Sequence, residues 1–208
     1  MTNPLVPQEN TAMPTTMTRP ELTLPEAESN ALRAAYADAD VILEYGSGGS
    51  TVMGAELGKR VLSVESDKKW AKMMRDWFVS NPPSRAVDVI WSDVGKTKKW
   101  GYPVDDSGWK RFARYPLEVW DLPEFEHPDV VLVDGRFRVG CALATAYRIT
   151  RPVTLYFDDY VNRRRYHEVE TFIGAPVETY GRMARFDLEP AALPPEKLLR
   201  IVQLMSFA

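Results

Sequence analysis

Short apolar segments alternate with longer segments of helical periodicity along most of the chain. Five apolar runs predict buried strands, at residues 41–45, 60–65, 86–91, 129–133 and 154–157. Four of these runs are followed by segments with the spacing of helices, at residues 50–57, 68–80, 137–149 and 164–173. Strands that alternate with helices in this way predict a parallel sheet that is covered by helices on both faces.

The ends of two helices carry local signals. Thr23 and Glu26 have the spacing of a capping box, with Pro25 in the first turn, and predict a helix that runs to residue 39. Asp67 is placed to cap the helix that follows the second strand. That helix repeats large apolar side chains three or four residues apart, which predicts one buried face made of Trp70, Met73, Met74, Trp77 and Phe78.

Both ends of the chain and one internal segment depart from this alternation. Residues 1–20 contain four prolines among polar residues and predict a loose arm outside a single domain of residues 21–208. Residues 94–128 lack both periodicities and are rich in aromatic side chains, which predicts a lid or acceptor loop at the ligand edge of the sheet. Residues 177–188 and 199–205 predict two final strands, an antiparallel addition to the sheet.

Composition and charge narrow the classes of partner. The 208 residues carry a net charge of −3, so a nucleic-acid backbone is not an expected partner. No apolar run is long enough to predict a membrane span. The single cysteine, Cys141, excludes an internal disulfide and a zinc site built from cysteines, and a cytoplasmic setting is expected. The sequence does not indicate an oligomeric state.

The most informative stretch is VILEYGSGGST, which joins the first strand to the next helix. Its loop consists of Gly46, Ser47, Gly48, Gly49, Ser50 and Thr51. The three glycines remove side chains where the backbone turns sharply and where a ligand has to approach. The hydroxyl residues at its end can cap the helix or bind the ligand that the first backbone amides face. A plain strand-to-helix turn needs only one glycine, so we predict a ligand-binding loop.

Two carboxylates indicate which ligand this loop binds. The dinucleotide fingerprint is G-x-G-x-x-G, and Thr51 stands where its third glycine would pack around a pyrophosphate. Glu65 ends the second strand and can accept both ribose hydroxyls, in NAD or in another adenosine cofactor. Glu44 favours a positively charged ligand and would repel a pyrophosphate. S-adenosylmethionine, with its ammonium and sulfonium groups, is therefore the cofactor that we predict.

With E-x-G-x-G-G-S-T after the first strand, Glu65 at the end of the second and Asp93 at the end of the third, the chain resembles the class I S-adenosylmethionine-dependent methyltransferases. The resemblance covers the chain from about residue 41 to the C-terminus. It implies a Rossmann-like, doubly wound α/β fold with seven strands in the order 3-2-1-4-5-7-6, strand 7 being antiparallel. It also implies that the loop cradles the methionine part, Glu65 holds the ribose, and Asp93 and Val94 lie at the adenine. The alternative for Asp93 is a helix cap or a turn residue.

Three more carboxylates follow the fourth and fifth strands, in the stretches LVDG and YFDDY. Because adjacent parallel strands end at the same edge of a sheet, we expect Asp134, Asp158 and Asp159 to meet there. Their oxygens suit Mg²⁺, which could hold an acceptor and lower the pKa of its hydroxyl, and we predict this metal site. In the alternative, Arg136 or Arg163 neutralises the carboxylates and no metal binds.

These stretches are similar to motifs of metal-dependent O-methyltransferases of the catechol type and of the antibiotic-sugar type. The latter often show D-G-x-H and D-D-Y at these places, whereas D-G-R-F here lacks the histidine. Asp134, Asp158 and His167 are the candidate catalytic residues, with His167 able to act as a base from the helix after the fifth strand. A surface position is the alternative for His167. The nearby arginines either bind an acidic substrate or balance the aspartates.

The predicted function is methyl transfer from S-adenosylmethionine to a small-molecule acceptor, on oxygen and with the assistance of Mg²⁺. One alternative is a Rossmann oxidoreductase that binds NAD or NADP, which would require the missing third glycine and a proton donor. The other alternative is a protein that binds S-adenosylmethionine without catalysis, keeping the loop and Glu65 but lacking an acceptor pocket.

Overall fold

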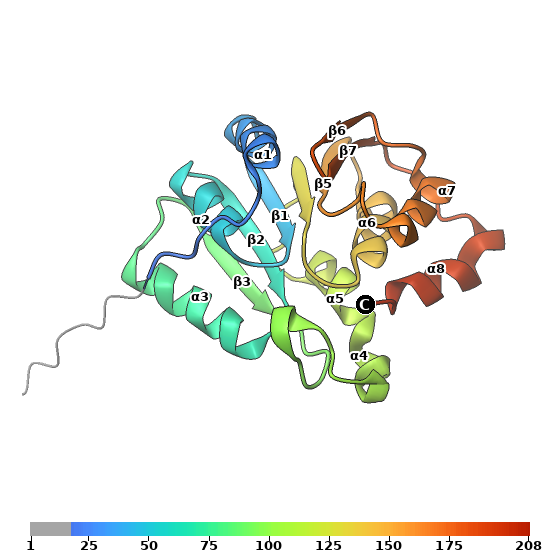
Figure 1. Cartoon of the computed structure of the whole chain (residues 1–208), viewed down its shortest axis with the longest axis horizontal. Coiled ribbons are helices and arrows are strands. Elements are labelled where there is room, and N and C mark those ends of the chain that lie inside the picture. Colours follow the sequence, from blue (N-terminus) through green and yellow to red (C-terminus); the bar gives the residue numbers. More distant parts are fainter. Residues whose placement is uncertain (1–17) are drawn as a thin grey trace, which may run out of the picture.

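A seven-stranded β-sheet lies at the centre of the computed structural model, which describes residues 18–208. The strands are β1 (Val41–Tyr45), β2 (Arg60–Glu65), β3 (Val87–Trp91), β4 (Val130–Val133), β5 (Val153–Phe157), β6 (Glu178–Tyr180) and β7 (Met183–Leu188). They stand in the order β3-β2-β1-β4-β5-β7-β6 (Figure 1). The first five strands pair in parallel, whereas β7 pairs antiparallel with β5 and β6. The predicted Rossmann-like fold and its strand order are confirmed.

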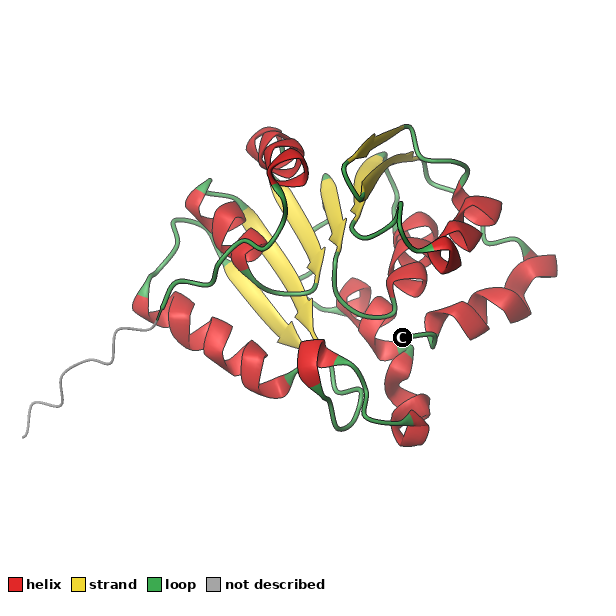
Figure 2. Cartoon of the chain, in the orientation of Figure 1, coloured by secondary structure: helices red, strands yellow, loops and turns green. Residues whose placement is uncertain are grey.

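Helices cover both faces of this sheet (Figure 2). One face carries α1 (Glu26–Asp38), α2 (Gly49–Glu56) and α3 (Lys68–Ser80), and the other carries α5 (Arg114–Leu117), α6 (Arg138–Arg148) and α8 (Leu198–Met205). Two short helices, α4 (Trp109–Phe112) and α7 (Glu170–Ile173), belong to the connections after β3 and β5. Short 3₁₀ segments are η1 (Lys99–Gly101), η2 (Asp106–Gly108), η3 (Glu118–Asp121), η4 (Arg164–Val169) and η5 (Pro195–Lys197).

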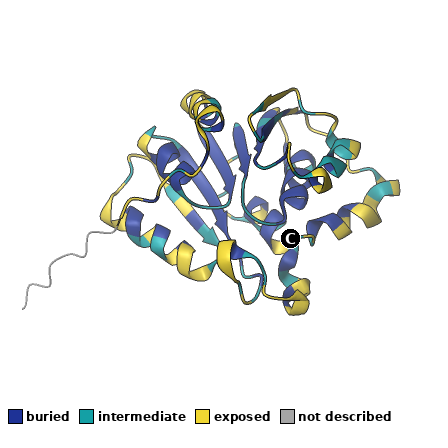
Figure 3. Ribbon diagram, viewed as in Figure 1, coloured by how far each residue is buried: buried dark blue, intermediate teal, exposed yellow. Residues whose placement is uncertain are grey.

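The central strands are buried on both sides because alternate residues enter different clusters. In β1, Leu43 and Tyr45 pack in the cluster that contains residues of α5 and α6. Ile42, which points to the opposite face, packs with Tyr36 of α1 and Met53 of α2. Figure 3 shows the result, with buried strands and with exposed outer sides of the helices. A sheet covered in this way leaves the loops at the carboxyl ends of its strands as the place for a ligand.

The C-terminal elements correct the sequence-based prediction. Residues 177–188, predicted as one strand, contain both β6 and β7. The strand predicted at residues 199–205 is wrong, because these residues lie in α8, which packs on α6. Its buried side chains recur at helical spacing and are Ile201, Leu204 and Met205. A short apolar run fits a strand and a buried helix equally well, and the neighbouring helix decided between them.

The predicted helix signals have mixed outcomes. Asp67 caps α3 as predicted, its carboxylate accepting hydrogen bonds from the backbone N–H groups of Lys69 and Trp70. The predicted capping box is wrong, because α1 begins after Pro25 and no side chain of residues 18–208, that of Thr23 included, caps it. Trp70 does not belong to the buried face of α3, since 41% of it is exposed. That face is formed by Ala71, Met74, Trp77 and Phe78, with Met73 partly buried beside them.

Residues 94–128 fold into short helical turns connected by loops (Figure 2). Phe112, Tyr115 and Trp120 anchor this segment in the main hydrophobic cluster. Trp100 and Trp109 are largely exposed instead. The segment is therefore attached to the core through part of its aromatic side chains and open to solvent through the rest, and its action as a lid stays a prediction.

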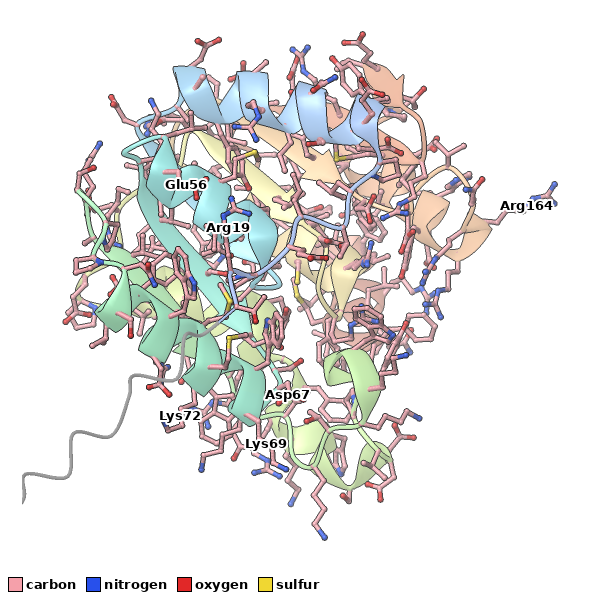
Figure 4. All side chains as sticks on the ribbon, turned by 60° about the vertical axis from the view of Figure 1, so that its left-hand side comes forward. Arg19, Glu56, Asp67, Lys69, Lys72 and Arg164 are labelled. Carbon is pink, nitrogen blue, oxygen red and sulfur yellow. The ribbon has the colours of Figure 1, made fainter. Side chains whose placement is uncertain are left out.

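The predicted arm of residues 1–20 lies outside the described residues except for its last three. Of these, Arg19 forms an ion pair with Glu56 of α2, with 2.8 Å between nitrogen and oxygen (Figure 4). The chain then crosses the start of α2, where the backbone of Leu22 approaches Gly49. Within residues 18–208, no helix is both long enough and apolar enough to cross a membrane.

We expect limited proteolysis of the free protein to cut residues 94–128 before it cuts the sheet. Trypsin finds the exposed Lys96, Lys98 and Lys99 near the start of this segment, whereas the strands around it are buried. Mass spectrometry of the first fragments identifies the sites, with cuts before residue 18 counted separately. Early cleavage within residues 130–157 would contradict the division into core and lid.

Candidate active site

The loop between β1 and α2 turns at Gly46. Its φ of +108° is strained for any residue with a side chain, and a Cβ there would lie 2.8 Å from the backbone nitrogen of Gly135. The Gly46 N–H donates to the carbonyl of Val64 at 2.8 Å, and the Gly135 N–H donates to the carbonyl of Tyr45. The loops that follow β1 and β4 therefore touch through their backbones.

The carboxylate of Glu44 lies beneath this loop and is fully buried. One of its oxygens accepts a hydrogen bond from the Tyr36 hydroxyl at 2.7 Å, and the other accepts one from the Thr51 hydroxyl. Burial raises the pKa of Glu44, and the hydrogen bonds from Thr51 and Tyr36 oppose this rise. Glu44 thus joins α1, β1 and α2 under the loop, whereas the sequence-based interpretation placed its carboxylate against a cationic ligand.

Side-chain hydroxyls hold the rest of the loop. The Thr51 hydroxyl, besides donating to Glu44, accepts a hydrogen bond from the backbone N–H of Gly48 at 2.9 Å. The hydroxyls of Ser47 and Ser63 lie 2.7 Å apart and share a hydrogen bond. The backbone of Gly48 is extended, and a Cβ built on it would meet no atom of residues 18–208 within 4 Å outside its chain neighbours. The loop is therefore fixed from below and open at Gly48.

Two neighbours of this loop were not found from the sequence. The backbone before α1 passes so close to Gly49 that a Cβ there would lie 2.3 Å from the nitrogen of Leu22. The indole N–H of Trp70 donates to the carbonyl of Ser47 at 2.7 Å. Ser50, beside Gly49, is buried at the start of α2. No local signal identifies these contacts, because the spacing of Trp70 matches a buried helix face.

Glu65, at the end of β2, is almost wholly buried and faces the same loop. Its carboxylate accepts hydrogen bonds from the backbone N–H of Asp67 at 2.8 Å and of Ser47 at 3.3 Å. Burial raises the pKa of Glu65, and these backbone donors oppose the rise. A Cβ on Gly101 would lie 3.2 Å from its Oε1. The turn at η1 therefore covers the carboxylate that we predicted to hold a ribose.

The three residues that follow β3 have different surroundings. Asp93 accepts a hydrogen bond from the backbone N–H two residues further on and pairs with Arg111, which is the turn arrangement named above as the alternative. Val94 is buried in the main cluster. The Ser92 hydroxyl is buried and has no hydrogen-bond partner among residues 18–208. Its backbone N–H donates to the Glu65 carbonyl, so this free hydroxyl lies beside the end of β2.

This row of features fits S-adenosylmethionine. The open space at Gly48, the carboxylate of Glu65 and the free hydroxyl of Ser92 follow β1, β2 and β3, which are neighbours in the sheet. In a doubly wound sheet, the parts of an adenosine cofactor lie in sequence along this edge. The three features follow the strands at which the resemblance to the family implies the amino-acid part, the ribose and the adenine, in that order.

Asp134, Asp158 and Asp159 meet beyond β4 and β5, as predicted, but arginines occupy their oxygens. Arg138 places one guanidinium nitrogen 3.0 Å from Asp134 and 3.3 Å from Asp159. Arg182, in the turn between β6 and β7, binds both oxygens of the buried Asp158, at 2.9 and 3.0 Å. Such bidentate pairing uses the lone pairs that a metal would need.

Arg163 completes the balance of charge, 2.7 Å from Asp159. Three carboxylates are thereby matched by three guanidinium groups, Arg138, Arg163 and Arg182. Among residues 18–208 no group of three ligand side chains is arranged to hold a metal ion. The predicted Mg²⁺ site at the three aspartates is corrected accordingly: the donors present do not fit it, and arginine compensates their charge.

Asp134 and Asp158 have different environments. About a third of the Asp134 side chain is exposed (32%), whereas that of Asp158 is almost wholly buried. Burial of its carboxyl group raises the pKa of Asp134. The positive charge of Arg138 opposes this rise, and the nearby carboxylate of Asp158 adds to it. Burial acts in the same direction on Asp158, but the hydrogen bonds from Arg182 prevail and lower its pKa. Asp134 is therefore the carboxyl group that takes up a proton more easily.

His167 lies apart from this cluster. Its ring stacks on the ring of Tyr160, with 4.6 Å between centroids, and its Nε2 lies 3.0 Å from the Tyr160 carbonyl. No ion pair or hydrogen bond joins it to the three aspartates in the part of the chain that the structure describes. The placement does not support His167 as a base, and its half-buried ring, packed on Tyr160, also differs from the surface position that was the alternative.

Sequence reasoning included Arg138 among the arginines that could balance the aspartates, which the structure bears out, but it missed Arg182. Arg138 follows Asp134 by four residues, a spacing that could have indicated the pair. Arg182 reaches Asp158 only because β7 turns back beside β5. Nothing local predicts this second contact.

Solved structures with the same fold include methyltransferases. A methyltransferase-like protein from Silicibacter pomeroyi is 58% identical, with a TM-score of 0.88, over 91% of this chain and 99% of that chain. Rv0187 from MTB, solved with its cofactor bound, is 16% identical with a TM-score of 0.57, over 83% and 84% of the chains. A methyltransferase from Geobacter sulfurreducens is 10% identical with a TM-score of 0.52, over 80% of each chain. Models of protein families and curated proteins gave no match.

Two glycine substitutions should separate support of the loop from ligand binding. We expect Gly46→Ala to lower the free energy of unfolding by about 1–3 kcal/mol or more, because its φ is positive and Gly135 leaves no room. Gly48→Ala should leave thermal stability nearly unchanged but weaken binding of S-adenosylhomocysteine, since its methyl group enters the open space. For each variant, thermal unfolding measures the stability and calorimetry measures the affinity for S-adenosylhomocysteine. Unchanged affinity in Gly48→Ala would contradict the assignment.

Proposed function

The chain belongs to the class I S-adenosylmethionine-dependent methyltransferases, and from this premise we propose that it methylates an oxygen atom of a small-molecule acceptor. The observation that carries the proposal is the backbone contact between Gly46 and Gly135. It supports a donor loop after β1 and an acceptor site after β4 that lie side by side. The acceptor, its oxygen atom and the roles of individual residues are the proposed part.

When bound, S-adenosylmethionine supplies an electrophilic methyl group on its sulfonium sulfur. The residues proposed to hold it are Gly46, Ser47, Gly48, Gly49, Ser50, Thr51, Glu65, Asp93 and Val94, to which we add Ser92. Thr51 and Glu44 keep the loop rigid from below. The remaining task of the protein is to hold an acceptor oxygen in line with the methyl group and to exclude water.

We propose Asp134 as the group that accepts the proton of the acceptor hydroxyl. Its side chain is partly exposed beside the donor loop, and the raised pKa brings it closer to the range in which a base is effective. Arg138 would orient its carboxylate. The buried Asp158 is proposed to act through this arrangement, with no contact to the substrate of its own.

The first test concerns the cofactor. We expect Glu65→Ala to raise the Kd of S-adenosylhomocysteine about five- to 150-fold, because hydrogen bonds to buried ribose hydroxyls contribute about 1–3 kcal/mol. Calorimetry with NAD as the competing ligand makes the measurement. Glu118→Ala, which removes a surface carboxylate paired with Arg114, is the matched control and should leave Kd unchanged.

Other results of this titration, or of the assay of methyl transfer, would favour a different site or a different function. An unchanged Kd in Glu65→Ala would remove Glu65 from the cofactor site. Binding of NAD in place of S-adenosylhomocysteine would support an oxidoreductase. Binding of S-adenosylhomocysteine without methyl transfer to any acceptor would support a binding protein that lacks catalysis.

The second test concerns the proton and the metal. With a panel of phenols, catechols and hydroxy acids, we expect formation of S-adenosylhomocysteine to be insensitive to EDTA. Asp134→Asn should slow it about 100-fold or more, the usual contribution of a general base. In the parent, the rate should fall as pH falls through the raised pKa of Asp134, because a protonated carboxyl cannot accept a proton. Activity lost with EDTA and restored by Mg²⁺ would contradict the arginine-balanced site.

A further inference from the structure

Arg136 emerges after β4 without a carboxylate partner in the part of the chain that the structure describes, unlike the three arginines that pair with the aspartates. Its guanidinium instead stacks on the ring of Tyr102, with 3.9 Å from its central carbon to the ring centroid. Its Nε is buried and makes no hydrogen bond within residues 18–208. Stacking by the face leaves the N–H edge of an arginine free, and that edge binds carboxylate and phosphate oxygens.

Both partners of this stack are attached to the cofactor site. Arg136 directly follows Gly135, whose backbone touches Gly46 in the donor loop. Tyr102 directly follows Gly101, which covers Glu65. The stack of Arg136 and Tyr102 therefore links the loop after β4 to the segment that covers Glu65, beside the proposed acceptor site.

The charges around the stack favour an anion. Because Arg138, Arg163 and Arg182 already match the three aspartates, the cluster does not repel a negative ligand. Burial alone would raise the pKa of Tyr102, yet Arg136 and Arg163 lower it, which reports a positive potential at the ring.

Arg165 adds to this potential. Its guanidinium lies 3.2 Å from the Tyr166 hydroxyl and has no carboxylate partner among the described residues. The edge of the sheet after β4 and β5 thus keeps three arginines, Arg136, Arg164 and Arg165, that have no carboxylate partner within residues 18–208, and of these Arg164 projects away from the protein (Figure 4).

We infer that Arg136, stacked on Tyr102 and flanked by Arg163, binds an anionic group of the acceptor, a carboxylate or a phosphate monoester. The acceptor is then a small organic anion whose charged group is held by Arg136 while its hydroxyl lies near Asp134, two residues earlier in the chain. The inference rests on the proposed function, because it names the substrate class of the same site.

The experiment is calorimetry on the full-length chain, with and without saturating S-adenosylhomocysteine. The probes are benzoate and phenyl phosphate, which distinguish carboxylate from phosphate, and benzamide, which has the shape of benzoate without its charge. We expect at least one anion to bind and benzamide not to bind. Arg136→Gln should weaken binding about tenfold or more, as loss of charge-assisted hydrogen bonds does. Arg136→Lys should recover part of the affinity, because it restores charge without the planar fork.

Arg164→Gln is the matched control, since it removes the same charge from the neighbouring loop. Arg164 projects away from the protein (Figure 4) and makes no ion pair or hydrogen bond within the described residues. The affinity of the Arg164→Gln variant for the anions should remain within about twofold of that of the parent, because salt screens an exposed charge at a distance. Thermal unfolding confirms that each variant is folded.

Three results would overturn the inference. They are benzamide binding as tightly as benzoate, neither anion binding, and Arg164→Gln weakening binding as much as Arg136→Gln. Failure of the proposed function gives a different result, because S-adenosylhomocysteine then does not bind, or it binds without methyl transfer to any acceptor. The anion titrations without that ligand still decide whether Arg136 forms a site.

Discussion

The close approach of the Gly46 and Gly135 backbones is the constraint on which the rest of the site depends. Adjacent parallel strands bring their loops to one edge of the sheet, but only residues without side chains allow the loops after β1 and β4 to touch. The loop proposed to hold the methyl donor consequently shares its edge with Asp134 and Arg136. A side chain at either glycine would separate the two halves of the proposed reaction.

Buried charge near this edge is balanced by the protein itself. Glu44 is satisfied by two hydroxyl groups, and the three aspartates are satisfied by three arginines. Such pairing offsets the several kcal/mol by which an unpaired buried charge destabilises a fold. Within residues 18–208, Arg136 is left outside this balance, so the pairing that compensates the aspartates leaves its charge available to the proposed ligand. Charge compensation thus connects stability to the choice of acceptor.

The chain by itself determined the features that arise from residues close in sequence. Apolar runs specified β1 to β5 within a residue or two, because a buried strand needs only its own side chains to be apolar. The glycine-rich loop and the Asp67 cap were recognisable because each is a local rule of backbone geometry. The strand order followed from the resemblance that the loop, Glu65 and Asp93 carry, and the structure has that order.

Only the tertiary structure decided which partners those residues meet. An apolar run became α8 because α6 offered it a surface, and Trp70 turned outward to the donor loop although its spacing suited the core. Arg182 contacts Asp158 because β7 pairs antiparallel with β5. The ring of His167 stacks on the ring of Tyr160 and does not face the aspartates. From a carboxylate at the end of a predicted strand, the sequence indicates only that a negative charge will lie at that edge of the sheet. Whether a metal, an arginine or a hydroxyl balances it depends on segments far away in sequence, which meet it only when the chain folds.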